Sequence, residues 1–130
     1  MTERIVVVAA VIERDGRFLV ARRLSGTHLA GLWEFPGGKV ATAETHEAAL
    51  EREIAEEIGC RISQLREIYR ASHAYPERTV ELYFYRGELH GAPQPMLGQE
   101  LRWITREEFA ALAFPPADGQ LISRLVHDGW

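Results

Sequence analysis

Apolar and polar residues between Thr45 and Gly59 alternate with the period of an amphipathic helix. Leu50, Ile54 and Ile58 recur at every fourth position, so they predict a buried stripe along one face. The side-chain oxygen of Thr45 can cap the first turn, and Gly59 can adopt the left-handed conformation that often ends a helix. We expect the rest of the chain to be organised around this helix.

Strand-like patterns precede and follow the helix. The Val-rich run over residues 5–12 predicts a strand that is covered on both faces. Asp15-Gly16 predicts a two-residue hairpin turn, after which residues 18–23 would return antiparallel to the first strand. Further strands are expected over residues 62–74, 79–85 and 100–104, with a turn at 75–78 and a surface loop at 90–98.

Two short helices are predicted near the C-terminus. Thr105 and Glu108 have the spacing of a capping box, which predicts a helix over residues 106–112. Pro115-Pro116 would end it, and a last helix over 117–126 would turn Leu121, Ile122 and Val126 inward. The order β-β-α-β-β-β-α-α predicts one α/β domain over residues 1–130, with a mixed β-sheet between helices.

Composition narrows the functional classes. The 130 residues are 46% apolar and 26% charged, as in an ordinary globular domain. The formal net charge of −4 argues against binding of a nucleic acid polymer. A single cysteine excludes an internal disulfide, and neither a membrane-spanning run nor a signal peptide is recognisable, so a cytoplasmic protein is expected.

Three carboxylates would project from one flank of the central helix, because Glu53, Glu56 and Glu57 are spaced i, i+3 and i+4. Their mutual repulsion would be relieved by a divalent cation, and Mg²⁺ prefers carboxylate oxygens and substrate phosphates. For an arbitrary sequence, a solvated acidic face with Arg52 paired to Glu56 would be the alternative.

A longer sequence pattern favours metal binding over a solvated acidic face. Fixed positions of the Nudix box, G-x5-E-x7-R-E-U-x-E-E-x-G-U, are filled by Gly38, Glu44, Arg52, Glu53, Ile54, Glu56, Glu57 and Gly59. Cys60 in the last apolar position is a mild departure. The preceding segment L-W-E-F-P-G-G-K, residues 32–39, resembles the MutT branch of this family. Over nearly its whole length, the chain therefore resembles a MutT-type Nudix hydrolase.

This resemblance implies the Nudix fold and a reaction. MutT-type members convert a nucleoside triphosphate and water into the monophosphate and pyrophosphate, using Mg²⁺, for which Mn²⁺ can substitute. The implied metal ligands are Glu56 and Glu57, with a backbone carbonyl of Gly37 or Gly38. Glu53 would be either a third ligand or the base that orients water. Arg52 would pair with Glu44 and hold the loop on the helix.

The resemblance also implies a nucleotide pocket. Residues that match the base pocket of MutT-like proteins specific for oxidised guanine are Arg23, His28, Phe35 and Arg78. Lys39 and Arg23 are candidates for phosphate contact, with a solvated surface charge as the alternative. The side chain that reads the base edge in the F-P-P-A-x stretch is Asp118 here, whereas the bacterial prototype has Asn.

The presence of Asp118 does not decide between two possible substrates. A protonated Asp could donate a hydrogen bond to 8-oxoguanine, whereas an ionised one only accepts and would suit cytosine. We expect hydrolysis of 8-oxo-dGTP, which would cleanse the nucleotide pool, with (d)CTP as the alternative substrate. A non-catalytic nucleotide sensor is a weaker alternative, because the box keeps all its glutamates. Monomer and homodimer both remain open.

The late loop carries a second departure. MutT relatives commonly read E-G-Q there, with Glu as an auxiliary metal ligand or base. This chain reads Leu97-Gly98-Gln99. The auxiliary carboxylate is therefore missing, unless Glu100 takes its place, and the identity of the general base stays open.

Overall fold

The computed structural model describes residues 3–26 and 30–130. The strands are β1 (Glu3–Val11), β2 (Glu13–Arg14), β3 (Arg17–Arg22), β4 (Trp33–Glu34), β5 (Gly37–Lys39), β6 (Arg61–Ala74), β7 (Arg78–His90) and β8 (Glu100–Ile104). The helices are α1 (His46–Ile58), the short 3₁₀ helices η1 (Glu107–Ala111) and η2 (Pro116–Asp118), and α2 (Gly119–His127). None of the helices in this part of the chain is long and apolar enough to span a bilayer.

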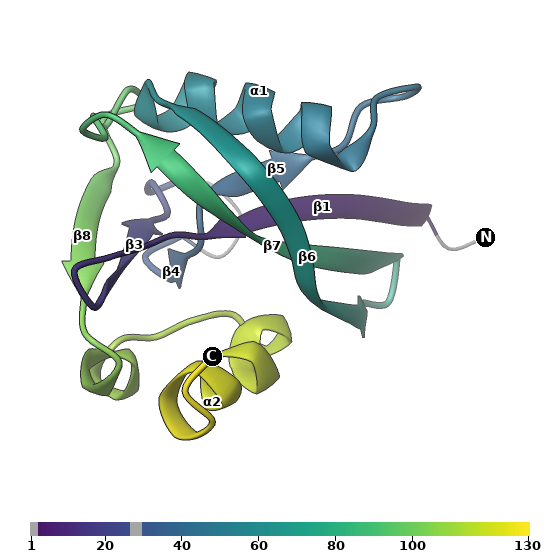
Figure 1. Cartoon of the computed structure of the whole chain (residues 1–130). Coiled ribbons are helices and arrows are strands. Elements are labelled where there is room, and N and C mark those ends of the chain that lie inside the picture. Colours follow the sequence, from purple (N-terminus) through teal and green to yellow (C-terminus); the bar gives the residue numbers. More distant parts are fainter. Residues whose placement is uncertain (1–2, 27–29) are drawn as a thin grey trace.

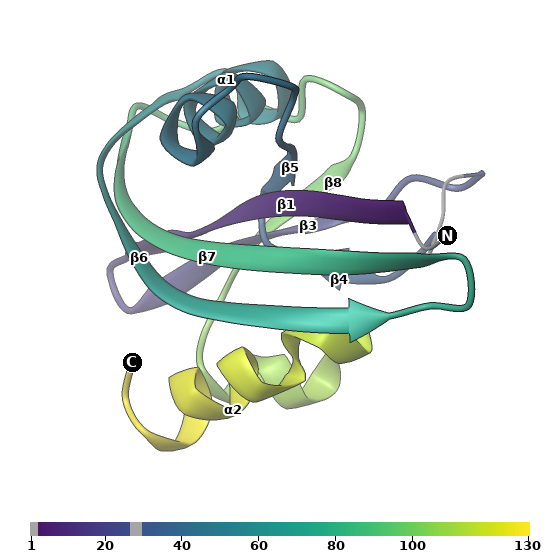
Figure 2. The same cartoon turned by 90° about the vertical axis from the view of Figure 1, so that its right-hand side faces the viewer.

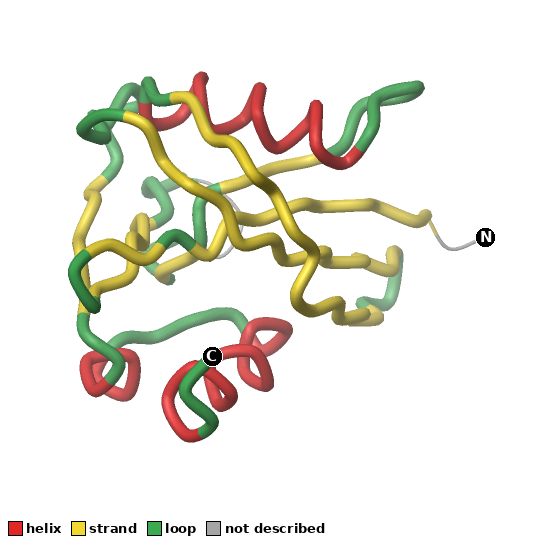
Figure 3. The backbone as a smooth tube through the Cα atoms, viewed as in Figure 1, coloured by secondary structure: helices red, strands yellow, loops and turns green. Residues whose placement is uncertain are grey.

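The strands form two sheets. One has the order β5-β1-β7-β6, and in the other β3 lies between β4 and β2 and also pairs with β8. Figures 1 and 2 show α1 above the first sheet, with α2 and the 3₁₀ helices on its other side. The same layering is visible when the backbone is coloured by secondary structure (Figure 3). The predicted α/β architecture is confirmed, although the sheet is divided in two.

Strand β1 lies inside the first sheet, and its second half, residues 8–11, is buried on both faces, as its continuous apolar sequence predicts. Residues 5–7 are only partly buried. It runs parallel to β7 and antiparallel to β5. Val8 and Ala10 belong to the core cluster that contains the apolar stripe of α1. Ala9 and Val11 belong to a second cluster, which includes Phe84 and the inner residues of α2.

The predicted pairing of residues 18–23 with the first strand is wrong for most of its length. After the turn at Asp15-Gly16, β3 pairs with the two-residue β2, and then with β4 and β8. Only one bond reaches back further, from the Leu19 amide to the Ile12 carbonyl at 3.0 Å. The reason is that β5 and β7 occupy both edges of β1, so β3 must build a separate sheet.

Helix α1 agrees with its sequence prediction. Thr45 Oγ1 accepts from the Ala48 amide at 3.1 Å, and Gly59 ends the helix with a φ of 67°. The predicted stripe is fully buried, as its members Leu50, Ile54 and Ile58 are 0% exposed. The flank that carries the glutamates is thereby turned toward β5.

The C-terminal segment differs in detail. The helix predicted over 106–112 is the shorter 3₁₀ helix η1, and α2 begins at Gly119 rather than at 117. Leu121 is buried as predicted, but Leu125 is the other fully buried residue of α2, with Ile122 and Val126 only partly covered. Asp118 lies at the junction of η2 and α2, where it is 5% exposed.

Candidate active site

Gly37 and Gly38 bring strand β5 into very close contact with its neighbours. A Cβ atom at Gly38 would lie 2.4 Å from Cδ of Glu53, and one at Gly37 would lie 2.0 Å from the carbonyl oxygen of Val8. A side chain at Gly37 would therefore collide with the backbone of β1, and one at Gly38 would displace the Glu53 carboxylate. The absence of a side chain at Gly38 lets the Glu53 carboxylate lie directly against the backbone of β5.

Arg52 connects this carboxylate to the loop before α1. Its Nε and Nη2 atoms donate to the two Glu44 oxygens at 2.8 and 2.9 Å, and Nη1 donates to Glu53 at 2.9 Å. Nη2 also donates to the Lys39 carbonyl at 3.2 Å. Hydrogen bonds from Arg52 and from the Ala41 amide lower the pKa of Glu44 to about 2. The predicted pair of Arg52 and Glu44 is present and ties loop, strand and helix together.

Glu57 lies half-buried beside Glu53, one turn further along the helix. Burial raises the pKa of Glu57 far above its usual range, and the hydrogen bond to Glu53 and the charge of Glu34 raise it further. The Gly37 backbone acts in the opposite direction. The neighbouring carboxylates of Glu53 and Glu34 thus add to the effect of burial and destabilise the ionised form of Glu57.

This excess of negative charge fits a divalent cation. Within residues 3–26 and 30–130, no three His, Cys, Asp or Glu side chains converge closely enough to hold a metal by themselves. Glu56 in particular is 57% exposed, and its Oε2 lies 3.4 Å from Nη1 of Arg52. This is the ion pair expected if the glutamates formed only a solvated acidic face. Mg²⁺ usually takes only one or two carboxylates and completes its shell with waters and substrate phosphates. The crowded pair of Glu53 and Glu57 beside the glycine backbone is compatible with such a site.

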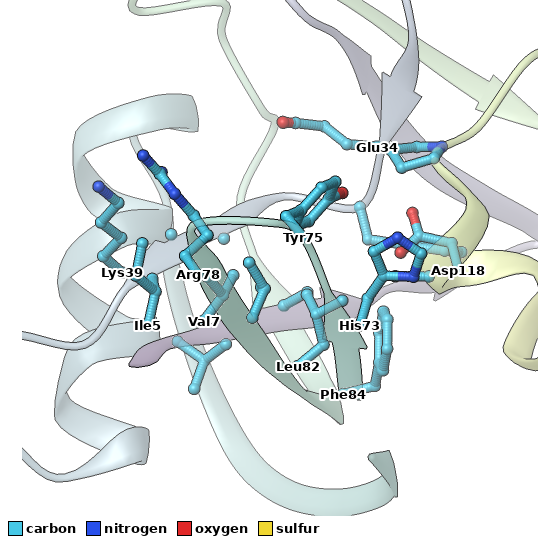
Figure 4. Close-up of a pocket in the computed structure, with 18 of the residues that line it drawn as sticks. Ile5, Val7, Glu34, Lys39, His73, Tyr75, Arg78, Leu82, Phe84 and Asp118 are labelled. Atoms are coloured by element: carbon cyan, nitrogen blue, oxygen red, sulfur yellow. The ribbon is translucent and has the colours of Figure 1, made fainter. Parts of the chain in front are cut away.

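A cavity of about 680 Å³ adjoins the glycine pair, on the face of the first sheet away from α1 (Figure 4). Its apolar floor follows the strand register, which aligns Ile5 with Val80 and Val7 with Leu82. Lys39 and Arg78 stand at one end of the cavity, and Asp118 lies at the other. The cavity therefore offers a flat apolar surface between a basic end and an acidic one.

Two carboxyl groups at this cavity have different environments. Asp118 is buried, and burial together with the charge of Glu34 raises its pKa to about 7. Burial also raises the pKa of Glu34, but there Arg23 counteracts it. Arg23 Nη1 donates to the two Glu34 oxygens at 2.9 and 3.1 Å. Near neutral pH, Asp118 can therefore serve as a hydrogen-bond donor.

The remaining predicted pocket residues fall into three groups. Phe35 lines the cavity but is only 4% exposed, and its ring lies 6.0 Å from Phe84 and 5.8 Å from Phe114. Lys39 and Arg78 are exposed lining residues. His28 lies outside the described residues.

Several residues that line this cavity were not predicted from the sequence, among them Glu34, His73 and Tyr75. The register places His73 opposite Val80, and its ring lies 4.6 Å from that of Tyr75. Alternation along β6, continued to the residue that follows its end at Ala74, could have placed both residues on one face. Which face that is could not be predicted, because the β6–β7 register shifts between Ser63 and Arg66 and again between Glu67 and Tyr69.

The loop before β8 lies against the C-terminal end of α1. The Met96 amide donates to the Glu57 carbonyl at 3.1 Å, and Leu97 is 55% exposed. The position that lacks the auxiliary carboxylate is therefore adjacent to the helix turn that carries Glu57.

Leu97→Glu is accordingly expected to raise kcat or to shift its pH dependence, because it restores an oxygen ligand or base near that turn. The measurement is a pH–rate profile at saturating Mg²⁺. Met96→Glu, which adds the same charge at a 59% exposed neighbour, serves as the control. An unchanged profile for Leu97→Glu would mean that the loop does not reach the site or that Glu100 already acts there.

Comparison with known proteins identifies the family. The family described as NUDIX domain matches residues 7–124. The 8-oxo-dGTP diphosphatase of Haemophilus influenzae is 40% identical, covering 98% of this chain and 96% of that protein. The CTP pyrophosphohydrolase of Escherichia coli is also 40% identical, covering 92% of this chain and 90% of that protein. The solution structure of the E. coli ORF135 protein, at 36% identity, covers 95% of this chain and 89% of that chain with a TM-score of 0.83.

The matched range includes the glycine pair, α1 and Asp118. These similarities agree with the complete Nudix box and with the fold, in which α1 and β5 bring the box glycines and glutamates together. The chain belongs to the Nudix family of hydrolases, as a nucleotide pyrophosphohydrolase similar to the 8-oxo-dGTP diphosphatases.

Proposed function

We propose that this pyrophosphohydrolase acts on 8-oxo-dGTP, converting it with water into 8-oxo-dGMP and pyrophosphate. The observation that carries the proposal is Asp118, a buried carboxyl at the end of the cavity with a pKa near 7. In its protonated form it would donate to the C6 carbonyl oxygen of the base, while its other oxygen accepts from N1–H or N7–H. Unmodified guanine has no proton on N7, so a hydrogen bond from N7–H to Asp118 would favour the oxidised base.

The apolar floor supports the same placement of the base. A planar base lying over Leu82 and Val7 would extend from Asp118 toward the basic end of the cavity. Lys39 would then contact the phosphates, and Arg78, the first residue of β7, would contact the base. Arg23 would act through Glu34, which it holds at the cavity wall.

The residues that would hold Mg²⁺ or Mn²⁺ are Glu53, Glu56 and Glu57, with a carbonyl of Gly37 or Gly38. When bound, the metal would neutralise phosphate charge and make a water molecule more acidic. Arg52 and Glu44 would keep Glu53 against β5, so that its carboxylate either binds the metal or orients the attacking water. Such hydrolysis would cleanse the cytoplasmic nucleotide pool of an oxidised precursor of DNA.

A (d)CTP pyrophosphohydrolase is the second candidate. It is favoured by the E. coli CTP pyrophosphohydrolase, which is as similar in identity as the Haemophilus protein. An ionised Asp118 would accept from the exocyclic amine of cytosine.

The test is pyrophosphate release from 8-oxo-dGTP, dGTP, dCTP and CTP, each with Mg²⁺ and with EDTA. We expect metal-dependent release that is fastest with 8-oxo-dGTP. Much faster cleavage of dCTP or CTP would replace the proposal with the second candidate, and binding without cleavage would indicate a sensor. A Glu57→Gln preparation, purified in parallel, controls for contaminating phosphatases.

A further inference from the structure

The last turn of α1 is held from outside by the loop that precedes β8. The Gln94 amide donates to the Ile58 carbonyl at 2.9 Å, and the Met96 amide donates to the Glu57 carbonyl at 3.1 Å. These carbonyls have no partner within the helix, because a helix leaves its last four unsatisfied. The loop therefore supplies the C-terminal cap beyond the single bond that Gly59 makes to Ala55.

The buried side chain of Gln99 completes this cap. Its Nε2 donates to the Glu57 carbonyl at 2.8 Å, and its Oε1 accepts from the Leu97 amide at 2.9 Å. Gln99 is 7% exposed, and only Asp118 is a comparably buried polar residue in the described part of the chain. A buried amide with both ends satisfied fixes the distance between the two groups that it bridges.

Gln99 also stands at a junction of the fold. It directly precedes β8, which pairs with β3 in the second sheet, while its amide reaches the helix that packs on the first sheet. The carbonyl that it binds belongs to Glu57, whose side chain lies beside Glu53 and the Gly37 backbone. A shift of this carbonyl would move the Glu57 carboxylate with it.

We propose that Gln99 is a positioning residue that sets the Glu57 carboxylate for metal binding by holding the last turn of α1 to the second sheet. The inference rests on the proposed role of Glu57 in a metal-dependent reaction. It assigns Gln99 no contact with substrate, so the affinity for the nucleobase should not depend on this residue.

Three variants separate this role from general support of the loop. Gln99→Leu removes both hydrogen bonds. Gln99→Glu keeps the size and the acceptor for Leu97, and once its carboxyl ionises it cannot donate to the Glu57 carbonyl. Because burial raises the pKa of a carboxyl, this variant is measured over a series of rising pH values. Gln94→Leu is the matched control, because Gln94 is exposed and caps the helix through its backbone amide, which the substitution retains.

Two readouts require no turnover. Mn²⁺ affinity, followed by electron paramagnetic resonance on the full chain without nucleotide, should fall about 10- to 100-fold in both Gln99 variants, as is usual when a residue behind a metal ligand is lost. Hydrogen exchange of the last turn of α1, measured in EDTA, should accelerate in both and remain unchanged in Gln94→Leu. In steady-state assays, kcat should fall and the half-saturating Mg²⁺ concentration should rise, with KM for the nucleotide unchanged at saturating Mg²⁺.

The inference is overturned if Gln99→Glu binds Mn²⁺ as the wild type does up to the highest pH at which the protein stays folded, because the donor to Glu57 would then be dispensable. An equal loss of Mn²⁺ affinity in Gln94→Leu would overturn the inference as well, because any substitution in this loop would then weaken metal binding. If Gln99→Leu does not fold, Gln99→Glu alone carries the test. A wild-type protein that cleaves none of the nucleotides, while the Gln99 variants still lose Mn²⁺ affinity, would overturn the proposed function and support the positioning role.

Discussion

Glu57→Gln is expected to lower kcat by about three orders of magnitude or more, equivalent to roughly 4 kcal/mol of activation barrier. The carboxylate lies beside Glu53 and the glycine backbone of β5, where the phosphates of a bound triphosphate would have to be neutralised. The amide has the same shape but no charge, so it would weaken metal binding without emptying the site. The measurement is turnover of the best substrate against Mg²⁺ concentration.

Folding provides the internal control for this result. Because Glu53 and Glu34 disfavour a charge at Glu57, its neutral replacement should not lower Tm in EDTA. Glu51→Gln, an exposed position on the same helix, should leave kcat unchanged. Wild-type activity should vanish in EDTA and return with Mg²⁺ or Mn²⁺. Near-normal turnover of Glu57→Gln at saturating Mg²⁺ would show that this flank of α1 is not the metal site.

The ratio of 8-oxo-dGTP to dCTP hydrolysis is expected to fall as the pH rises through about 7. Asp118 loses its proton in this range, and with it the ability to donate to the oxidised base, whereas an ionised carboxylate still accepts from cytosine. Above pH 7 the ratio should fall by up to about tenfold per pH unit. A ratio is the appropriate quantity, because ionisations of the metal site affect both substrates and cancel.

Asp118→Asn should make this ratio independent of pH, since the amide donates and accepts at every pH tested. It should also preserve or sharpen the preference for 8-oxo-dGTP over dGTP and reduce dCTP turnover. Discrimination of this kind is strong when a wrong base leaves a buried partner unpaired. A wild-type ratio that is flat between pH 6 and 8, or a strong preference for dCTP, would exclude Asp118 as a donor.

The same carboxyl links stability to pH. The folded protein keeps the Asp118 proton up to about pH 7, whereas an ordinary Asp releases it near 3.8. The folded state therefore binds more protons between these values, so the contribution of Asp118 to the free energy of unfolding decreases as the pH rises through this window. Asp118→Asn should accordingly raise Tm more at pH 8 than at pH 5, relative to the wild type.

The sequence alone was sufficient where interactions are local. Helix α1 depends on contacts three or four residues apart, so its cap at Thr45, its end at Gly59 and its buried stripe could all be predicted. Arg52 and Glu44 are separated by only eight positions, and their pairing was implied by the resemblance to the Nudix box. The box itself was sufficient to indicate the family and the α/β fold.

Only the tertiary structure decided which strands pair and what faces the cavity. Strand β3 could not pair along β1, because β5 and β7 occupy both of its edges, and no local pattern records such competition. Two register shifts between β6 and β7 determine that His73 faces the cavity, and the burial of Asp118 depends on how η2 meets the sheet. The sequence places Gln99 in a loop, and only the fold brings its side chain against the end of α1. Each of these results comes from contacts between residues distant in sequence, whose geometry is set by the packing of the whole chain.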